Sequence, residues 1–344
     1  MWPRRASQQP ASNPMRWVVV GTGAIAQKVT PLLARSKGCE VVAVASRSIE
    51  RAKEFCATIE GATGAAALQL GGAAGAFTGG EAQFDAAYVT LPNRMHPAWT
   101  VGLLERGVRV LCEKPLAWRA EQVRAMAATA GARFAEGFMN LHHPVSARLR
   151  AIAQGGEEGP IGRLVEVQAN RCSNMTLPER IATRRSHAWA GGAMMDLGCY
   201  CLSFARYVAG EEFVELRAHG ELAPATPGET KQVDGTVHLE GAFPSGVRLR
   251  AKCSIMEQEP THVRLIGTRG EAYCDWPWNP PEDAGAPVTV TRDGEELHEV
   301  VQGDSAFVYQ FERFVRGERI WGGDWEAQQA RAMEVCLEQL GVEY

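Results

Sequence analysis

Three small residues at Gly21, Gly23 and Ala26 form the spacing G-x-G-x-x-A, after a short apolar run and at the start of a helical pattern. The first permits a tight turn, the second lets a diphosphate approach the backbone, and the third lets the helix pack closely on the strand. The N–H groups and the positive dipole of the helix N-terminus attract phosphate. The motif therefore predicts a dinucleotide site. Its backbone contacts are expected from Gly21, Gly23, Ala24 and Ile25.

The end of the second expected strand reads Ser46-Arg47-Ser48, with no acidic residue. Sites for NAD usually carry Asp or Glu here to bind the ribose 2′-hydroxyl. Arg47 and Arg51 are four residues apart and share one helix face, so with Ser46 they can hold a 2′-phosphate by charge-assisted hydrogen bonds. The alternative is that both arginines are ordinary solvated helix residues. The sequence favours NADP(H) over NAD(H) as the cofactor.

Two further polar segments end expected parallel strands, where ligands bind in doubly wound folds. They are Leu91-Pro92-Asn93-Arg94-Met95-His96 and Cys112-Glu113-Lys114-Pro115. A third segment, 191–200, contains Asp196 and Tyr200, which lie four apart on one face of an otherwise apolar helix. A polar face in that position is costly unless it lines a site. Taken singly, Lys114 is equally compatible with a surface residue, and Asp196 and Tyr200 with core residues.

The elements that must position these residues change in character along the chain. Residues 15–138 alternate apolar strands with helices, which predicts a Rossmann domain with a doubly wound parallel sheet. Residues 139–344 predict an α+β domain for substrate binding and oligomerisation. Its largely antiparallel sheet is clearest at Val247–Lys252, where apolar and charged residues alternate. Residues 1–14 are expected to be a disordered tail, and the Ala/Gly-rich stretch 61–80 a loop with one weak helix and no assigned function.

Composition narrows the class of protein. The chain has 344 residues, 45% of them apolar, and a net charge of -4, which argues against a general nucleic-acid or membrane-surface binder. No apolar run approaches the roughly 20 residues that cross a bilayer. Nine cysteines show no paired spacing, so we expect free thiols in a reducing cytoplasm and no metal site.

Five segments in order resemble the glucose–fructose oxidoreductase/inositol dehydrogenase (Gfo/Idh/MocA) family, and the resemblance covers nearly all of the chain after Met15. They are G-T-G-A-I-A, L-P-N-R-M-H, C-E-K-P, A-E-G-F-M…H-P and G-G-A-M-M-D-L-G-C-Y. The sequence is most similar to the branch of dimeric dihydrodiol and NADP-linked D-xylose dehydrogenases. The family implies an NAD(P)-dependent oxidoreductase acting on a sugar, a polyol or a related alcohol or ketone.

The resemblance also implies individual roles. Lys114 would be the catalytic lysine near the substrate oxygen, and Tyr200, where many members carry His, the general acid/base. Asp196 would orient the substrate or Tyr200. Glu113 and Pro115 would shape the cofactor strand, and a cis peptide bond before Pro115 is allowed. The nicotinamide ribose would contact residues from the segment Leu91, Pro92, Asn93 and His96.

A lysine beside a tyrosine makes chemical sense for this reaction. Oxidising an alcohol removes a hydroxyl proton while hydride leaves for the nicotinamide. Free tyrosine has a pKa of about 10, and a nearby ammonium lowers it. The same ammonium stabilises a developing alkoxide. We therefore expect Lys114 to lower the pKa of Tyr200.

Several points stay open at this stage. Arg184, Arg185 and His187 fit either a substrate contact or a solvated loop. His143 is interpreted as structural, His142 is undecided, and the loop at 276–281 fits a pocket rim, an interface or a plain surface loop.

Two other functions remain in competition with the dehydrogenase. One is a non-catalytic NAD(P)-binding sensor of the same fold, and the other is an enzyme that recycles bound NAD(H). The resemblance also implies a homodimer or homotetramer through the sheet, although the charged outer face at Val247–Lys252 would make a wet interface or none.

Overall fold

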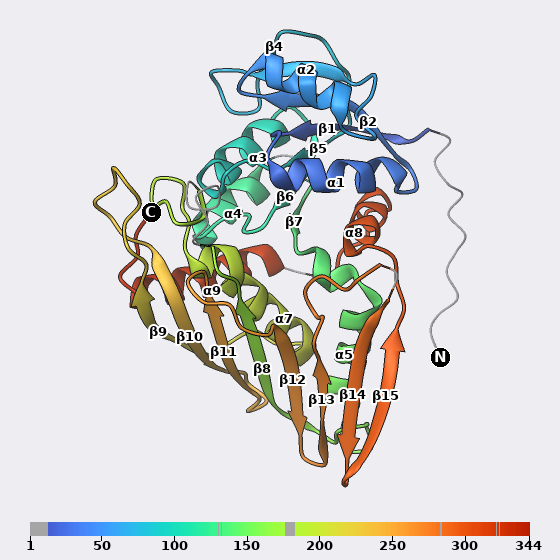
Figure 1. The fold of residues 1–344 in the computed structure, drawn as a ribbon, viewed down its shortest axis with the longest axis vertical. Helices are drawn as coiled ribbons and strands as arrows, with labels where there is room; N and C mark the ends of the chain where they lie inside the picture. Colours follow the sequence, from blue (N-terminus) through green and yellow to red (C-terminus); the bar gives the residue numbers. More distant parts are fainter. Residues whose placement is uncertain are drawn as a thin grey trace.

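The computed structural model shows two domains, one above the other in Figure 1. It describes residues 13–129, 131, 133–175, 183–282, 284–320, 322 and 324–344. The expected tail, 1–14, lies outside the described residues except for its last two. Within the described residues, no helix has the length and apolarity needed to cross a membrane.

The first domain is built on a seven-stranded sheet in the order β4-β3-β2-β1-β5-β6-β7, parallel except between β3 and β4. Residues 17–20 of β1 are fully buried, because helices cover both faces of the sheet. This confirms the predicted Rossmann architecture. The strands are β1 Met15–Val20, β2 Cys39–Ser46, β3 Ala66–Leu70, β4 Phe77–Thr78, β5 Ala86–Val89, β6 Arg109–Glu113 and β7 Phe134–Gly137. The helices are α1 Ala24–Arg35, α2 Ile49–Thr58, α3 His96–Leu104 and α4 Ala120–Ala128, with a 3₁₀ turn η1 at Asn93–Met95.

The stretch 61–80 differs from our expectation of a loop with a weak helix. It forms β3, which pairs in parallel with β2, and the short β4, which turns back along β3. Phe77 packs edge-on against Phe84 and lies 5.8 Å from Trp99. Alanine has little intrinsic preference for strands, so pairing with β2 determines this structure and local pattern does not.

The second domain holds an eight-stranded sheet in the order β15-β14-β13-β12-β8-β11-β10-β9. Only the pair β8–β11 is parallel, so the predicted, largely antiparallel sheet is confirmed. At Val247–Lys252, Val247, Leu249 and Ala251 are buried and both arginines are exposed, as the alternation predicts. The strands are β8 Leu164–Cys172, β9 Glu215–Leu222, β10 Asp234–Ala242, β11 Arg248–Ser254, β12 His262–Gly267, β13 Gly270–Cys274, β14 Ala286–Arg292 and β15 Glu295–Val301.

Helices cover one face of this second sheet and leave the other open (Figure 1). The apolar helix expected to carry Asp196 and Tyr200 is present, but it begins with a π-helical turn, which is often found at functional sites. The covering elements are a 3₁₀ turn η2 at Met139–His142, α5 Pro144–Ala153, the π turn η3 Met194–Gly198, α7 Cys199–Ala209 and part of α9 Trp325–Gln339.

The two terminal helices also pack against the first domain. In α8, Ala306–Val315, the rings of Phe311 and Phe314 lie 5.7 and 5.2 Å from Trp17. In α9, Ala327 and Ala330 join the core that covers one face of the first sheet. The end of the chain therefore fixes the domains against each other, whereas the exact boundary at 138/139 stays a prediction.

Candidate active site

The N-terminus of α1 has the form of a phosphate cradle. Gly23 is the N-cap without a side-chain capping bond, and the first turn holds no acidic residue. A Cβ on Gly23 would meet nothing within 4 Å, so the first N–H groups face open space. Gly21 has φ +116°, and a Cβ there would lie 2.5 Å from Thr90 Oγ1. Both glycines and the adjoining Ala24 and Ile25 thus fit a diphosphate at this helix end.

The end of β2 presents polar groups beside this cradle. The hydroxyls of Ser46 and Thr22 lie 3.2 Å apart. Ser48 caps α2 by accepting a hydrogen bond from the N–H of Arg51. Arg47 and Arg51 are exposed, and neither forms an ion pair with the described residues. Both guanidinium groups are therefore available to an anion.

The segment after β5 joins the two domains. Asn93 donates its side-chain amide to Ala190 O over 2.8 Å. His96 is buried, with Nδ1 2.8 Å from Pro115 O and Nε2 2.7 Å from Leu91 O. Each ring nitrogen thus faces a backbone carbonyl, and because burial lowers the pKa of His96 only one of the two can donate to its carbonyl, so a contact of His96 with a cofactor would not use them. Leu91 and Pro92 are half-buried at the edge of the sheet.

The structure brings Lys114 and Asp196 together from opposite domains. Lys114 Nζ donates to the carbonyl oxygen of Asp196 over 2.8 Å and to its Oδ1 over 2.9 Å. Arg184 donates to the other carboxylate oxygen. The side chains of Lys114 and Asp196 are 12% and 8% exposed, whereas that of Arg184 is 43% exposed. One carboxylate therefore holds two cations.

These contacts set the charge of the cluster. Although burial opposes ionisation, Lys114 and Arg184 hold the pKa of Asp196 well below its usual range. Burial also disfavours the charged lysine, but the neighbouring carboxylate raises the pKa of Lys114. Lys114 is thus an ammonium at neutral pH.

Tyr200 lies against the same cluster. Lys114 Nζ is 5.0 Å from its ring centroid, and the guanidinium carbon of Arg171 is only 3.7 Å away. Its hydroxyl donates to the thioether of Met139 over 3.6 Å. Burial raises the pKa of Tyr200, and the opposing effects of Lys114 and Arg171 do not cancel it. The expected lowering by lysine is present as a contribution, but burial outweighs it.

Two buried glutamates, Glu113 and Glu136, form hydrogen bonds next to the segment that carries Lys114. Tyr88 donates its hydroxyl to Glu113 over 2.5 Å, and burial raises the pKa of Glu113. Glu136 accepts from the N–H of Leu116, and burial raises its pKa to about 8. The peptide bond from Lys114 to Pro115 is cis, which the family resemblance allowed.

Asp234 positions the helix that carries Asp196 and Tyr200. This fully buried carboxylate of β10 accepts from the N–H of Met194 over 2.5 Å, at the start of the π turn. Gly192 has φ +109°, and a Cβ there would collide with Asp234 Oδ1. Burial outweighs the backbone hydrogen bonds and raises the pKa of Asp234 to about 6.

The structure gives Arg185, His187 and His143 backbone partners. Arg185 bonds Pro224 O, His187 Nε2 contacts Glu343 O, and both are buried, so they are not solvated loop residues. His143 caps α5 by accepting from Val145 N, which supports its structural interpretation.

Two neighbours of Tyr200 were not assigned to the site by the sequence analysis. Trp278 is buried, with its ring 6.1 Å from that of Tyr200, while Trp276 is exposed. Arg171 was missed altogether. Its only signal was its alternation with Val167 and Ala169 on the inner face of β8.

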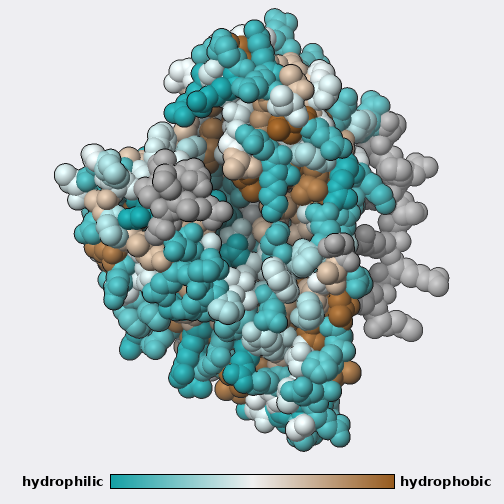
Figure 2. All heavy atoms as spheres, in the orientation of Figure 1, coloured by the Kyte–Doolittle hydropathy of each residue, from teal (hydrophilic) through white to brown (hydrophobic). Residues whose placement is uncertain are grey.

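A hydrophilic hollow is visible where the two domains meet (Figure 2). Arg94 contributes to this junction by donating Nε to Ala188 O. Strand ends of the first domain and the helix start of the second thus converge on it.

Known proteins share both domains. The model of the oxidoreductase family with an NAD-binding Rossmann fold, GFO/IDH/MocA, matches residues 15–136. The GFO/IDH/MocA C-terminal domain matches residues 149–273.

Individual relatives cover most of the chain. The trans-1,2-dihydrobenzene-1,2-diol dehydrogenase of Bos taurus is 32% identical over 276 residues, 78% of this chain and 76% of that protein. The D-xylose 1-dehydrogenase (NADP(+)) 2 of Haloferax volcanii is 28% identical over 310 residues, 88% of each chain. The crystal structure of aldose-aldose oxidoreductase from Caulobacter crescentus, complexed with glycerol, has a TM-score of 0.80 at 21% identity and covers 95% of this chain and 97% of that one.

The raised pKa of Asp234 predicts a pH dependence of stability. An unfolded aspartate titrates near 3.9, so between that value and about 6 the folded chain keeps a proton that the unfolded chain has lost. The contribution of this carboxyl to the free energy of unfolding is fully present below pH about 4 and is lost as the pH rises through 6. Asp234→Asn is neutral throughout. Its free energy of unfolding, relative to the parent protein, should rise by about 3 kcal/mol from pH 4 to pH 7.5 in urea titrations.

The exposed Gln302 provides a control that removes no ionisable group. Gln302→Asn should change stability by a nearly constant amount across the same pH range. A flat difference for Asp234→Asn as well would contradict the assignment of a raised pKa to that carboxyl.

Proposed function

Because the chain belongs to the GFO/IDH/MocA oxidoreductase family, we propose that it transfers hydride between NADP(H) and a sugar, polyol or diol, with Lys114 and Tyr200 as its acid/base pair. That the chain is an NAD(P)-dependent oxidoreductase follows from the family. The observation that supports the finer assignment is the meeting of Lys114, Asp196 and Tyr200 at the carboxyl ends of the Rossmann strands.

The dinucleotide would lie on Gly21, Gly23, Ala24 and Ile25, and it supplies the hydride when bound. Lys114 is held as an ammonium by Asp196, so it is suited to polarise a substrate oxygen and to stabilise negative charge on it. Asp196 orients the lysine from two atoms, a more specific role than the family resemblance gave it.

Tyr200 completes the proposed pair as a proton donor or acceptor. Its raised pKa keeps the hydroxyl protonated at neutral pH, and among the described residues the hydroxyl donates to a thioether, a weak acceptor. The proton is therefore ready for a carbonyl oxygen in the reducing direction. In the oxidising direction the nearby cations Lys114 and Arg171 favour the phenolate.

The proposed substrate class is supported by relatives and by the surface. The relatives carry the names of a diol dehydrogenase and a D-xylose dehydrogenase. The hydrophilic hollow between the domains suits a substrate rich in hydroxyl groups (Figure 2).

The preference for NADP(H) is supported by charge. Ser46, Arg47 and Arg51 surround the end of β2, and the two arginines have no carboxylate partner among the described residues. The 2′-phosphate of NADP(H) would give them an anionic partner. The name of the Haloferax volcanii relative also specifies NADP(+).

Removal of either proposed catalytic group should abolish most of the turnover. Lys114→Ala and Tyr200→Phe should each lower kcat by about 100-fold or more, the usual contribution of a positioned acid or base. NADPH affinity should change little, because neither side chain is expected to hold the phosphates. Steady-state kinetics with diols, aldoses and polyols and a fluorescence titration with NADPH check both parts. Arg163→Gln, on the exposed turn before β8, is the control.

Near-normal turnover of Lys114→Ala would remove its catalytic role. NADPH binding by the parent protein without turnover on any substrate would favour the competing non-catalytic sensor. Turnover that needs no added cofactor would favour the enzyme with recycled NAD(H).

Cofactor preference depends on Arg47 in this proposal. Arg47→Ala should weaken NADPH binding by about 10-fold or more, because a hydrogen bond to a charged group contributes about 1.5–3 kcal/mol. NADH binding should stay within about twofold. Parallel fluorescence titrations measure both, and Arg124→Ala, on α4, is the matched control. Equal losses for the two cofactors would show that Arg47 does not act on the 2′-phosphate.

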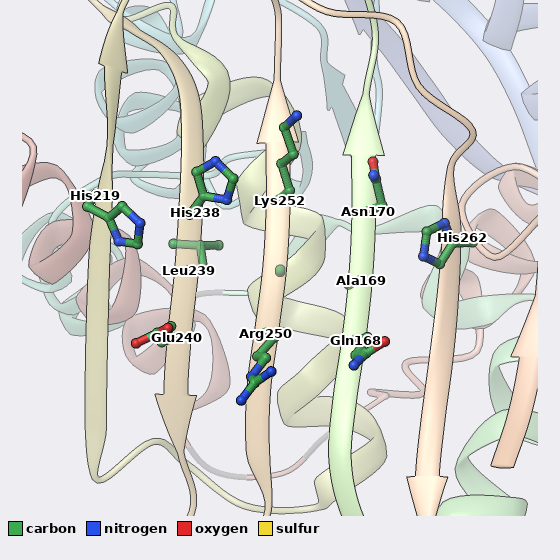
Figure 3. A pocket seen from close by; sticks show the side chains of 11 residues that line it. Gln168, Ala169, Asn170, His219, His238, Leu239, Glu240, Arg250, Lys252 and His262 are labelled. Atoms are coloured by element: carbon green, nitrogen blue, oxygen red, sulfur yellow. The ribbon is translucent and has the colours of Figure 1, made fainter.

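The open face of the second sheet is the proposed contact between two copies of the chain. One cross-strand row on it runs His219, His238, Lys252, Asn170 and His262, as paired in the sheet and drawn in Figure 3. Its neighbours carry both signs of charge, since the exposed Arg248 and Arg250 flank the buried Glu166. A face with alternating charge can complement a copy of itself, as a wet interface.

Charge reversal on this face tests the proposed dimer. Arg250→Glu would place a third carboxylate beside Glu166 and Glu240 in each copy. The variant dimer should therefore dissociate at a higher protein concentration than the parent dimer. Sedimentation velocity measures this, with Arg163→Glu as the control outside the face. A parent protein that sediments only as a monomer would end this part of the proposal.

A further inference from the structure

The side chain of Arg171 packs against the ring of Tyr200. It follows Val167 and Ala169 on the inner face of β8, and its guanidinium carbon lies 3.7 Å from the centroid of Tyr200. The same group is 5.3 Å from the ring of Trp278. Two aromatic rings therefore fix the position of the guanidinium within the candidate site.

This guanidinium has no counter-ion in the described part of the chain. Its Nε is buried without a hydrogen-bond partner, and no carboxylate there pairs with it. Arg206, fully buried and stacked on Trp325 in the same way, is held by two oxygens of Glu212 and by Gln329. Arg171 lacks such a partner, although burying a cation without one is costly.

The candidate site also carries surplus positive charge. Lys114 and Arg184 already share the single carboxylate of Asp196, and Arg171 adds a third cation. Burial raises the pKa of Glu113, although the hydrogen bond that it accepts from Tyr88 favours the carboxylate, and Glu113 forms no ion pair with Arg171. A neutral sugar would leave the surplus in place, whereas an anionic group on the substrate would neutralise it.

We propose that Arg171 binds a carboxylate of the substrate, so that the enzyme acts on hydroxy acids of the aldonic-acid type or on the corresponding oxo acids. The planar guanidinium fork matches a carboxylate with two parallel hydrogen bonds, as Lys could not. This inference rests on the proposed function, because it places the reacting carbon at Tyr200.

The geometry limits where the carboxylate sits on the substrate. The guanidinium of Arg171 lies against the ring whose hydroxyl would exchange the proton, so a carboxylate bound to its N–H groups would lie close to that hydroxyl. The reacting carbinol must therefore be one or two carbons from the carboxylate. A hydroxy acid oxidised at its second or third carbon meets this condition, whereas a compound with the acid at the far end of the chain does not.

Matched substrate pairs test the inference. Each pair differs only in a terminal carboxylate: D-gluconate and D-glucitol, D-galactonate and galactitol, D-glycerate and glycerol. The parent protein should show a higher kcat/KM for the acid of at least one pair by about 10-fold or more. Arg171→Gln should reduce that ratio by about 10- to 100-fold, through KM. Arg171→Lys, which keeps the charge but lacks the fork, should give an intermediate loss.

A matched control separates the carboxylate contact from loss of a stacked arginine. Arg150 on α5 lies 4.9 Å from the ring of Tyr207 and outside the candidate site. Arg150→Gln should leave the acid-to-polyol ratio unchanged. Loss of Arg171 should also move the pH profile of kcat upward, because this cation lowers the pKa of Tyr200. That shift affects both members of a pair equally and so leaves the ratio to report on the carboxylate.

Each outcome distinguishes the inference from the proposed function. If NADPH does not bind, the proposed function fails. If NADPH binds and the polyols are preferred, or if Arg171→Gln lowers both members of each pair equally, the proposed function stands and the carboxylate inference is wrong. If no compound turns over, calorimetric binding of D-gluconate to the NADPH-loaded protein decides. Equal affinity in the parent protein and Arg171→Gln, or no binding, overturns the inference.

Discussion

The carboxylate of Asp196 pairs with two cations at once, and the two domains meet where it does so. Lys114 reaches it from the end of β6 and Arg184 from the segment before the π turn. Removing one partner from a buried ion pair typically costs about 3–5 kcal/mol. The pair therefore fixes where the Rossmann edge faces the second domain, and it keeps the lysine charged in a place where burial alone would favour a neutral amine.

Asp196 can hold this position because other buried groups hold its helix. Asp234 accepts the N–H of Met194 at the helix start, and Tyr344 donates its hydroxyl to Gly191 O just before it. Farther along, Gln329 of α9 donates to Cys199 O. The helix with Asp196 is thus anchored by β10, by the end of the chain and by α9, and α9 in turn packs on the first domain.

Much of this architecture could be predicted from the sequence, because its signals are local. The glycines before α1 and the alternation at Val247–Lys252 each encode one element. The stretch 61–80 could not be predicted, because its strands depend on pairing with β2. The pKa of Tyr200 was expected in the wrong direction because the sequence indicates a neighbouring cation but not the extent of burial.

Arg171 shows the same limit at the level of function. In sequence it is one polar residue that continues the inner-face alternation of a strand, where an apolar residue would be expected. Only the folded chain places it against Tyr200 with no carboxylate partner among the described residues. Asp196 cannot serve it, since both carboxylate oxygens already bind other cations. The arrangement that secures the lysine thus leaves the positive charge of Arg171 unpaired within the described residues, and in the reaction that we propose a carboxylate of the substrate would balance it.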